Sequence, residues 1–530
     1  MRRSLPKALA ASVLLAAGCG RRPPQPPPER FLPASAGLAV LVPALGEGAA
    51  AAGKLLRAAS EVAATAAVAE SAASMRAQIG LDPFDPAGLA AAGLDPARAA
   101  GLALLPGGGG LLVLPVADQE KLDALLARLA RDRGGAPHRE ESRAGGATVV
   151  AFRRGPGGPA ALAYAVEQGS ALVAPGPGAP ALAGAAADRA EAESLGASPA
   201  FASARGALGE GLAALAYAPA GSPFLAGLPP LRDGAAAGLR PLPGGLEVRA
   251  ALLLPPGRHD VWREVAGGEG AAGAGRDELA ALPADLFAAA RFGGDPAALG
   301  RRLGYALPAE VAARLGRARF DLARDLFGHL APGAAAGLSL APRLDVGALS
   351  RGGAAAAAAD PFRLVHLAAV ARVRDPVGLR ASLERLAHSG RALGLRVSAR
   401  QLPGGGSAWA APLGGGVLTW ALRGDRLLVA GGARRLEALL GTGPRWKAPT
   451  PAAGAALASG GAAGALDVGA LVAAFRALPP ESFGTGPDGF VVRSLADRFL
   501  EPASRLRAAS ARLEVLAGAA RVDVVVEAVP

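Results

Sequence analysis

The chain has 530 residues and a formal net charge of +12, and only 4% of its residues are aromatic. Its length allows two to four domains, each with enough chain to bury a core. The basic charge lies mostly on arginines scattered among acids, with few aromatic side chains between them to stack on bases, so the composition argues against a nucleic-acid partner.

The first eighteen residues are typical of an export signal. Arg2, Arg3 and Lys7 precede an apolar run from Ala8 to Ala17, which is too short to span a bilayer. Residues 1–18 are therefore predicted to be a removable signal peptide. Cys19 follows at once and is the only cysteine, so no internal disulfide can form.

The residues Leu15-Ala16-Ala17-Gly18-Cys19 resemble the lipobox of bacterial lipoproteins, although Ala16 stands where that motif usually has Leu, Val or Ile. The resemblance implies cleavage before Cys19 and lipidation of Cys19, so that acyl chains on this residue hold the protein to a membrane. A Gly after the cysteine further implies the outer membrane, with the protein facing the periplasm. The alternative is an ordinary signal peptide with an incidental cysteine.

A proline-rich segment follows, so residues 19–30 are predicted to be the lipidated cysteine and an extended tether about 30 Å long. Beyond the signal, no window of about 18 residues is apolar enough to predict a transmembrane helix. A long helical stretch is then expected over 44–78.

The body of the chain repeats one plan. In the first copy a strand over 111–116 leads to Asp118, a helix N-cap, and to leucines 122, 125, 126 and 129 on one helical face. A hairpin over 162–174, a helix over 179–189 and a strand over 246–254 follow.

The second copy has a strand over 364–373, then Asp375 and Pro376 at a helix start, with leucines 379, 383 and 386 on one face. A hairpin over 418–430, a helix over 433–440 and a strand over 521–529 complete it, and a helical stretch over 296–330 corresponds to that over 44–78. The order favours antiparallel sheets packed with helices, an α+β class. We expect a first module over 31–263, a Gly-rich linker over 264–281 and a second module over 282–530.

Each copy opens on Leu-Pro-Ala, at Leu32 and at Leu282, and Asp285 completes an LPAD motif in the second copy where the first has Ser35. With the strand and hairpin above, these motifs resemble a family of uncharacterised bacterial secreted and lipid-anchored proteins. That resemblance covers most of residues 31–530 and implies no known reaction or ligand.

Catalytic and cofactor motifs are few. Gly48–Lys54 starts like a phosphate-binding loop, but Leu55 replaces the required hydroxyl residue, and Gly268–Gly273 spells a dinucleotide fingerprint inside the linker. Both are interpreted as coincidence. No histidine pair has metal-ligand spacing, His366 is expected to be a core or edge residue, and the three Asp-Pro sequences are interpreted as helix starts rather than a calcium site; their aspartates are Asp82, Asp85 and Asp95.

These observations predict no cofactor, no metal and no catalytic residue. The leading hypothesis is a non-catalytic envelope lipoprotein with a binding or scaffolding role at the membrane surface. A second is a carrier of lipid or another apolar ligand, which a cavity wide enough for acyl chains would support. A third is a hydrolase with a dispersed site, which requires a His gathered with acids or a Ser.

Overall fold

The computed structural model describes residues 25–529, except 61–69, 71–72, 75, 78–79, 145, 227–232, 256, 268–272, 307–308, 342–343, 347–363, 391–393, 395, 403–405, 414–415, 432, 460 and 485–486. The predicted signal peptide and Cys19 lie outside the described residues. Contacts divide the chain into two compact units: unit 1 within Met1–Ala50 and Ile79–Ser198, and unit 2 within Ala51–Gln78 and Pro199–Pro530.

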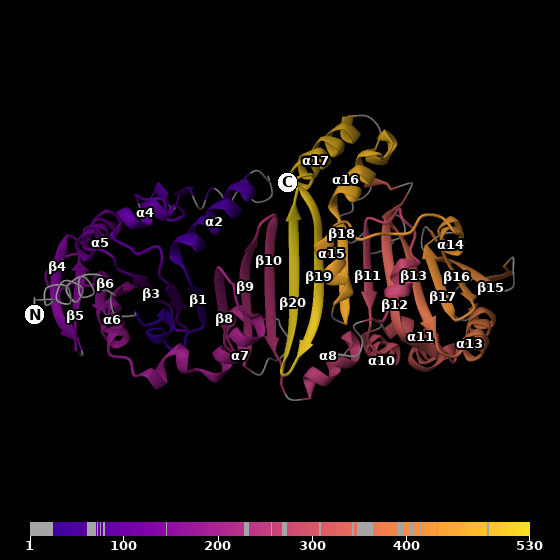
Figure 1. The fold of residues 1–530 in the computed structure, drawn as a ribbon, viewed down its shortest axis with the longest axis horizontal. Helices are drawn as coiled ribbons and strands as arrows, with labels where there is room; N and C mark the ends of the chain where they lie inside the picture. The colour runs from indigo at the N-terminus through magenta and orange to yellow at the C-terminus, as the bar shows by residue number, and fades with distance from the viewer. Residues whose placement is uncertain are drawn as a thin grey trace, which may run out of the picture. The chain divides into compact units, whose positions relative to one another are not determined.

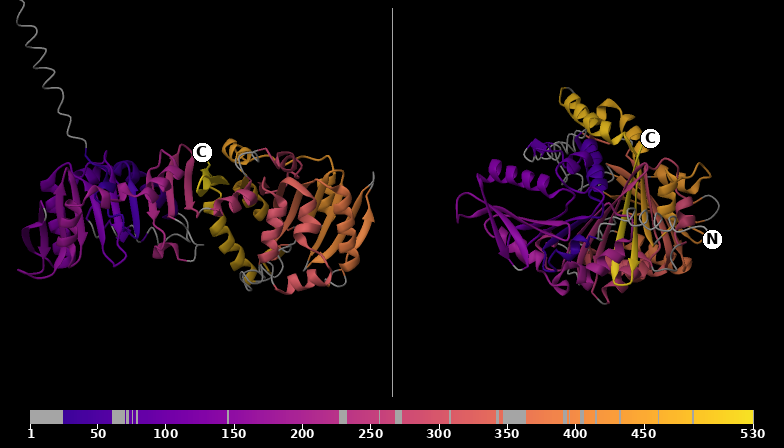
Figure 2. Two further views of the ribbon diagram at one scale, coloured as in Figure 1. Left: turned by 90° about the horizontal axis from the view of Figure 1, so that it is seen from below. Right: turned by 60° about the vertical axis from the view of Figure 1, so that its left-hand side comes forward.

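Unit 1 is built on one antiparallel sheet whose strand order is β1-β2-β3-β7-β6-β5-β4 (Figure 1; Figure 2, indigo to magenta). Its strands are β1 (Leu38–Val42), β2 (Ala100–Leu104), β3 (Gly110–Pro115), β4 (His138–Ala144), β5 (Ala147–Arg153), β6 (Ala160–Glu167) and β7 (Ser170–Pro175). Its helices are η1 (Pro28–Arg30), the start of α2 (Leu45–Ser60), α4 (Pro86–Ala91), α5 (Gln119–Gly134), α6 (Ala179–Ala187), η3 (Glu191–Glu193) and η4 (Leu195–Ala197).

Helices pack on both faces of this sheet because its strands are apolar on both sides. Along β5, Val150 and Phe152 belong to a core with α4 and α5, whereas Val149 and Ala151 pack with the alanines of α6. Successive side chains of a strand point to opposite faces, so one strand serves both layers.

Unit 2 is built on a second antiparallel ladder, ordered β8-β9-β10-β20-β19-β18-β11-β12-β13-β17-β16-β15-β14. Its strands are β8 (Ala214–Ala218), β9 (Gly234–Leu242), β10 (Gly245–Leu253), β11 (Ala288–Phe292), β12 (Leu330–Leu340), β13 (Val365–Val373), β14 (Ser398–Gln401), β15 (Ser407–Leu413), β16 (Gly416–Arg423), β17 (Arg426–Gly431), β18 (Ala462–Asp467), β19 (Leu506–Leu516) and β20 (Ala519–Ala528).

The helices of unit 2 lie before and between these strands in the chain. They are α7 (Pro199–Leu208), η5 (Pro223–Leu225), α8 (Arg258–Ala266), α9 (Arg276–Ala280), α10 (Pro296–Ala306), α11 (Ala309–Arg317), the π-helix η7 (Leu322–Leu326), η8 (Phe327–His329), α13 (Pro376–His388), α14 (Ala433–Leu440), α15 (Pro451–Ala458), α16 (Val468–Arg476), η11 (Pro480–Phe483) and α17 (Pro487–Ala503). Both units combine antiparallel strands with helices, so the predicted α+β class is confirmed.

The boundary between units falls before residue 199, not in the predicted linker. The reason is the pairing of β10 with β20 from Gly245↔Glu527 to Leu253↔Ala519, which joins the strands after residue 199 to the C-terminal strands. The predicted linker over 264–281 also contains helix α9, in which Glu278 is buried and pairs with Arg372.

The predicted local elements of the two copies are found at the expected places. The Asp118 side chain accepts from the Lys121 amide at the start of α5, and that of Asp375 accepts from the Gly378 amide at the start of α13. The hairpins turn at Glu167↔Ser170 and at Arg423↔Arg426. These N-cap and hairpin predictions are confirmed.

The Leu-Pro-Ala motifs make the same contacts in both copies. Leu32 and Leu282 are fully buried, and their carbonyls accept from the amides of Leu195 and Trp446. The prolines that follow each form an isolated β-bridge. In both copies the motif therefore binds the segment before the first strand to a loop more than 150 residues further along the chain.

The end of the predicted tether is packed rather than extended. Pro28–Arg30 form η1, and Pro28 is buried. The Gln25 Nε2 atom donates to Gly169 O at 3.0 Å, and Gln25 Oε1 accepts from Arg98 at 2.9 Å. Residues 25–30 are thus part of unit 1.

Candidate functional site

The candidate site is an apolar cavity of about 820 Å³ in unit 1, between the sheet and helices α4 and α5. Its lining consists of leucines, prolines and small residues with a single charged side chain: Leu45, Leu81, Pro83, Leu89, Leu94, Leu112, Leu114, Leu122, Leu125, Leu126, Leu129, Ala130, Arg154, Pro159, Ala160, Ala161, Leu162, Val173, Gly176 and Pro177. The volume lies in the range of about 300–1,000 Å³ typical of small-molecule sites.

Two sequence patterns produce the cavity walls. Leu122, Leu126 and Leu129 follow at helical spacing along α5 and face the sheet. On β3, Leu112 and Leu114 alternate with the fully buried Leu111 and Val113, and so face α5. The spacing of the α5 leucines predicts one apolar helical face, and the structure places that face against the sheet.

A polar contact joins helix α5 to the sheet beside the cavity. The Tyr164 hydroxyl donates to the Asp123 carboxylate of α5 at 2.5 Å, and Arg139 of β4 lies 3.5 Å from the same carboxylate. Burial, followed by the hydrogen bond to Asp123 and the charge of that carboxylate, raises the pKa of Tyr164 well above its usual value. This hydrogen bond connects β6 to α5, and neither of its two residues lines the cavity.

The mouth of the cavity is formed by two loops. Arg154, Pro159 and Pro177 are exposed, whereas Leu122 and Leu126 are buried. Arg154 is the one charged residue among the described residues that line the cavity. Nothing in the local sequence distinguishes this arginine from the other scattered arginines.

In unit 2, the strands that correspond to β3 and β7 are β13 and β17, and they line a more open trough. Leu112 pairs with Val173 in unit 1, and Ala369 pairs with Val429 in unit 2. Because alanine replaces leucine, the trough has a wall of small residues, and its two adjoining parts measure about 510 and 440 Å³. The parts share Ala290, Ala336, Gly464 and Ala511.

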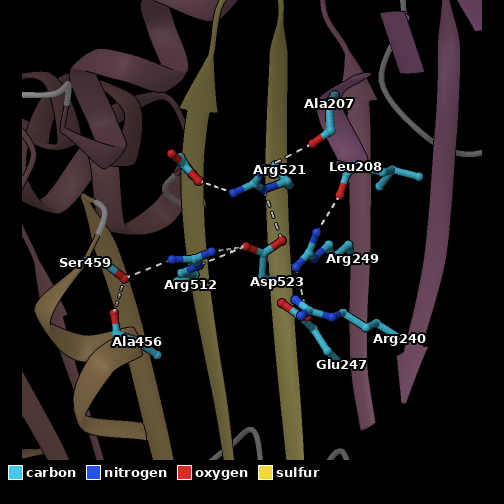
Figure 3. Close-up of polar contacts among 11 residues, drawn as sticks. Ala207, Leu208, Arg240, Glu247, Arg249, Ala456, Ser459, Arg512, Arg521 and Asp523 are labelled. Atoms are coloured by element: carbon cyan, nitrogen blue, oxygen red, sulfur yellow. Dashed lines mark hydrogen bonds and ion pairs between the residues drawn. The ribbon is translucent and has the colours of Figure 1, made fainter. Parts of the chain in front are cut away.

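Charged side chains gather on the alternate positions of the central strands of unit 2, as Figure 3 shows. Asp523 on β20 accepts from Arg512 Nε at 2.8 Å and lies 3.1 Å from Arg521 Nε. Beside it, Glu247 accepts from Arg249 at 3.0 Å. Burial acts to raise the pKa of Glu247, but the charge of Arg249 and of neighbouring guanidiniums holds it below its usual value.

Helices cover this charged cluster with backbone carbonyls. Arg521 donates to Ala207 O at 3.2 Å and Arg249 donates to Leu208 O at 2.8 Å, both at the end of α7, and Arg512 donates to the Ser459 hydroxyl at 3.1 Å (Figure 3). Carboxylates and carbonyls thus compensate the guanidiniums, which is the pattern of a structural network.

The residues considered as sites in the sequence have local structural roles. Asp85 caps α4, whose first residue is Pro86, and Asp82 and Asp95 accept from the amides of Phe84 and Ala97. The helix-start interpretation is confirmed for Asp85 and is wrong for Asp82 and Asp95, which begin turns. Gly48–Lys54 lie within helix α2, so they form no phosphate-binding loop, and most of Gly268–Gly273 lies outside the described residues.

His366 lies on β13 opposite Ser339 of β12 and is half-buried. Burial, followed by the charge of Arg435, lowers its pKa, while Asp285 acts in the opposite direction. Asp285, the last residue of the LPAD motif, forms an ion pair with Arg435 of α14. The aspartate of the motif therefore holds α14 to the sheet.

The fold does bring a His, an Asp and a Ser together, as the dispersed-site hypothesis requires. His329 Nδ1 lies 3.0 Å from Asp375 Oδ2, and its Nε2 lies 3.4 Å from Ser382 Oγ. Sequence reasoning missed this cluster because Asp375 and Ser382 follow the histidine by 46 and 53 positions.

The position of Ser382 does not suit a nucleophile. It lies in the middle of α13 with 3% of its surface exposed, and its hydroxyl also accepts from Arg385 at 3.1 Å. A nucleophile needs open space where the substrate carbonyl can approach. Asp375 already accepts from the Gly378 amide, which together with His329 holds the pKa of this carboxyl below its usual value. The cluster fastens the start of α13 to His329.

Comparisons with known proteins identify no family. No protein-family model and no curated protein matches the chain. Two crystal forms of TP0453 are similar to it, both at 10% identity: form IV with a TM-score of 0.25, covering 46% of this chain and 86% of that one, and form III with 0.24, covering 43% and 80%. Scores this low carry no argument about fold or function. Within the described residues, no helix is long and apolar enough to cross a membrane.

Proposed function

We propose that this protein is a non-catalytic lipoprotein of the bacterial cell envelope that carries acyl chains in the cavity of unit 1. The observation that supports it is the leucine-lined space of about 820 Å³ between the sheet and α5. Apolar sites of this size accept apolar ligands. The cavity favours the carrier hypothesis over a scaffold, for which a closed core would be enough.

The membrane anchor and the cellular location are proposed from the sequence. Lipidation of Cys19 would anchor the chain in a membrane. We expect this to be the outer membrane, with the protein facing the periplasm. A Cys19→Ser variant tests the anchor: we expect it to leave the membrane fraction, and a variant that still floats with membranes would contradict the lipoprotein assignment.

The ligand is tested by native mass spectrometry of the mature chain carrying Cys19→Ser, purified gently from the soluble periplasmic fraction. We expect extra mass that organic solvent extracts as lipid. Leu125→Trp should fill the cavity from α5 and abolish this mass, whereas Ala124→Trp, on the exposed side of the same helix, should retain it. Bare protein with the wild-type cavity, before and after added fatty acid, would contradict the carrier function.

Chain length provides a second test. Each methylene moved from water into the cavity contributes about 0.8 kcal/mol. Two further methylenes should therefore tighten binding about 15-fold until the cavity is full. An affinity that does not depend on chain length would show that the acyl chain stays outside.

A further inference from the structure

We propose that unit 2 holds a further binding site, for a phosphate monoester, beside the last turn of helix α11. This site goes beyond the carrier function, because it lies in unit 2 and uses none of the residues that line the cavity of unit 1. A cavity of about 570 Å³ lies among α10, α11 and the π-helix η7. Among the described residues, its charged lining consists of Arg301, Arg319, Arg324 and Asp321.

Two of the three arginines have no counter-charge. Arg324 forms an ion pair with Asp325 at 2.9 Å, and the Asp321 carboxylate accepts from the Arg324 amide at 2.9 Å. The guanidiniums of Arg301 and Arg319 are exposed, and within the part of the chain that the structure describes they form no hydrogen bond and no ion pair. Residues 296–326 carry six arginines against three acids, so the surrounding segment is basic as well.

The backbone at Arg319 is strained. Its φ of +51° lies in the left-handed region, which residues with a Cβ atom rarely adopt. The amides of Arg319 and Phe320 donate to the Gly316 and Leu315 carbonyls at 3.0 Å each, and glycine is the usual left-handed residue of this helix end. Ala318 and Phe320 on either side are buried and hold this conformation. An arginine here therefore lowers stability without gaining a side-chain contact within the protein, which points to a contact outside it.

The chemistry of the lining selects the class of ligand. A phosphate monoester carries a charge of about −1.5 to −2 at pH 7, and its oxygens match the parallel N–H donors of two guanidiniums. Leu315 and Leu322 are half-buried in the same lining and suit a short apolar group on the ester oxygen. Gly316 leaves room in the wall, because a Cβ atom added there would meet no atom within 4 Å.

The test measures binding of butyl phosphate, butyl sulfate and butanol to the mature chain with Cys19→Ser, by calorimetry at neutral pH and low salt. We expect butyl phosphate to bind about 10-fold more tightly than the singly charged sulfate, and butanol not to bind this site. Arg301→Gln and Arg319→Gln should each weaken phosphate binding about 10-fold. The matched controls are Arg302→Gln on α10 and Arg317→Gln on α11; these exposed arginines do not line the cavity, so the change should stay within about 2-fold.

Arg319→Gly separates binding from folding. Glycine relieves the left-handed backbone, so this variant should bind butyl phosphate more weakly and yet show a higher midpoint of thermal unfolding. Asp321→Asn should tighten phosphate binding, because it removes a like charge from the lining. Unchanged binding in Arg319→Gly, or an equal loss in Arg302→Gln and Arg301→Gln, would overturn the inference.

Phosphatidylcholine vesicles with and without phosphatidic acid distinguish two sources of the phosphate. Binding that requires phosphatidic acid and is lost in Arg319→Gln assigns a lipid head group. Binding of butyl phosphate without vesicle binding assigns a soluble phosphate monoester. Failure of butyl phosphate and of both vesicles would overturn this inference and leave the carrier function standing. Butyl phosphate binding that is lost in Leu125→Trp but kept in Arg319→Gln would place the ligand in unit 1 and overturn it as well.

Discussion

Asp523 is the residue whose loss should destabilise unit 2 most clearly. Its side chain is 2% exposed and lies between Arg512 and Arg521, at 2.7–2.8 Å and 3.1 Å (Figure 3). Asp523→Asn keeps the volume and removes the charge. Two guanidiniums, 30% and 16% exposed, then lose their shared counter-charge.

Removal of one partner from a buried ion pair costs about 3–5 kcal/mol. Arg512 is partly solvated and Arg521 retains Glu514, so the lower end applies, and we expect about 3 kcal/mol. The free energy of unfolding is measured by urea titration followed by circular dichroism, with the transition of unit 2 analysed separately if two transitions appear.

Glu514→Gln is the matched control. It removes a carboxylate that also pairs with Arg521, but this side chain is 38% exposed, so the loss should be about 1 kcal/mol or less. A double-mutant cycle of Asp523→Asn with Arg512→Met should show a coupling of about 1–3 kcal/mol. A loss below about 0.5 kcal/mol for Asp523→Asn, or additive effects in the cycle, would refute the view that the network stabilises this pair of strands.

Three further predictions follow from local geometry. Gly93→Ala would place a Cβ atom 2.3 Å from Asp118 O at φ +86°, so it should lower the free energy of unfolding by about 3 kcal/mol or more. Gly108→Ala is the control, because Gly108 has φ +82° but nothing within 4 Å, and it should lower the free energy of unfolding by only about 1–2 kcal/mol. Equal losses in thermal or urea unfolding would contradict the clash at Gly93. Asp118→Ala removes the N-cap of α5 and should lower the free energy of unfolding at neutral pH. The hydrogen bonds from the amide and the side chain of Lys121 hold the pKa of the Asp118 carboxyl below its usual value, so this stabilisation is present at neutral pH and is lost as pH falls through the lowered pKa. Urea titrations at several pH values should therefore show that the variant loses less stability in acid than the wild type, and equal acid sensitivity would contradict the role of this N-cap. Burial lowers the pKa of His366, so protonation favours the unfolded chain and the free energy of unfolding should fall as pH drops below about 6.5. His366→Gln should remove that part of the pH dependence. An unchanged pH profile would show that this histidine does not titrate on unfolding.

Local sequence patterns determined the elements of both copies. A short carboxylate before a run of spaced leucines predicts the starts of α5 and α13, and the hairpin turns at 167–170 and 423–426 follow from residues that accept a tight turn. These features depend on neighbours a few residues apart. They can therefore be read before any tertiary contact is known, and the export signal and the lipidation of Cys19 are likewise predictions from local sequence.

Long-range packing decided the division of the chain and the candidate site. The pairing of β10 with β20 joins residues about 270 positions apart, as in Val248↔Val524, and no local pattern specifies such a partner. The α5 leucines could be assigned to a buried face from their spacing. Whether the facing strand fills the space between them depends on how closely helix and sheet approach, which is a property of the whole packed layer.

The sequence by itself therefore determined the α+β class, the N-caps of α5 and α13 and the two hairpin turns, because these depend on periodicity and on short-range hydrogen bonds. Only the tertiary structure decided that the leucines of α5 and β3 line one apolar cavity. It also placed Ser382 next to His329 and buried it within α13. Cavities and clusters arise from residues distant in the chain, and their shape depends on the volume that neighbouring side chains leave unfilled.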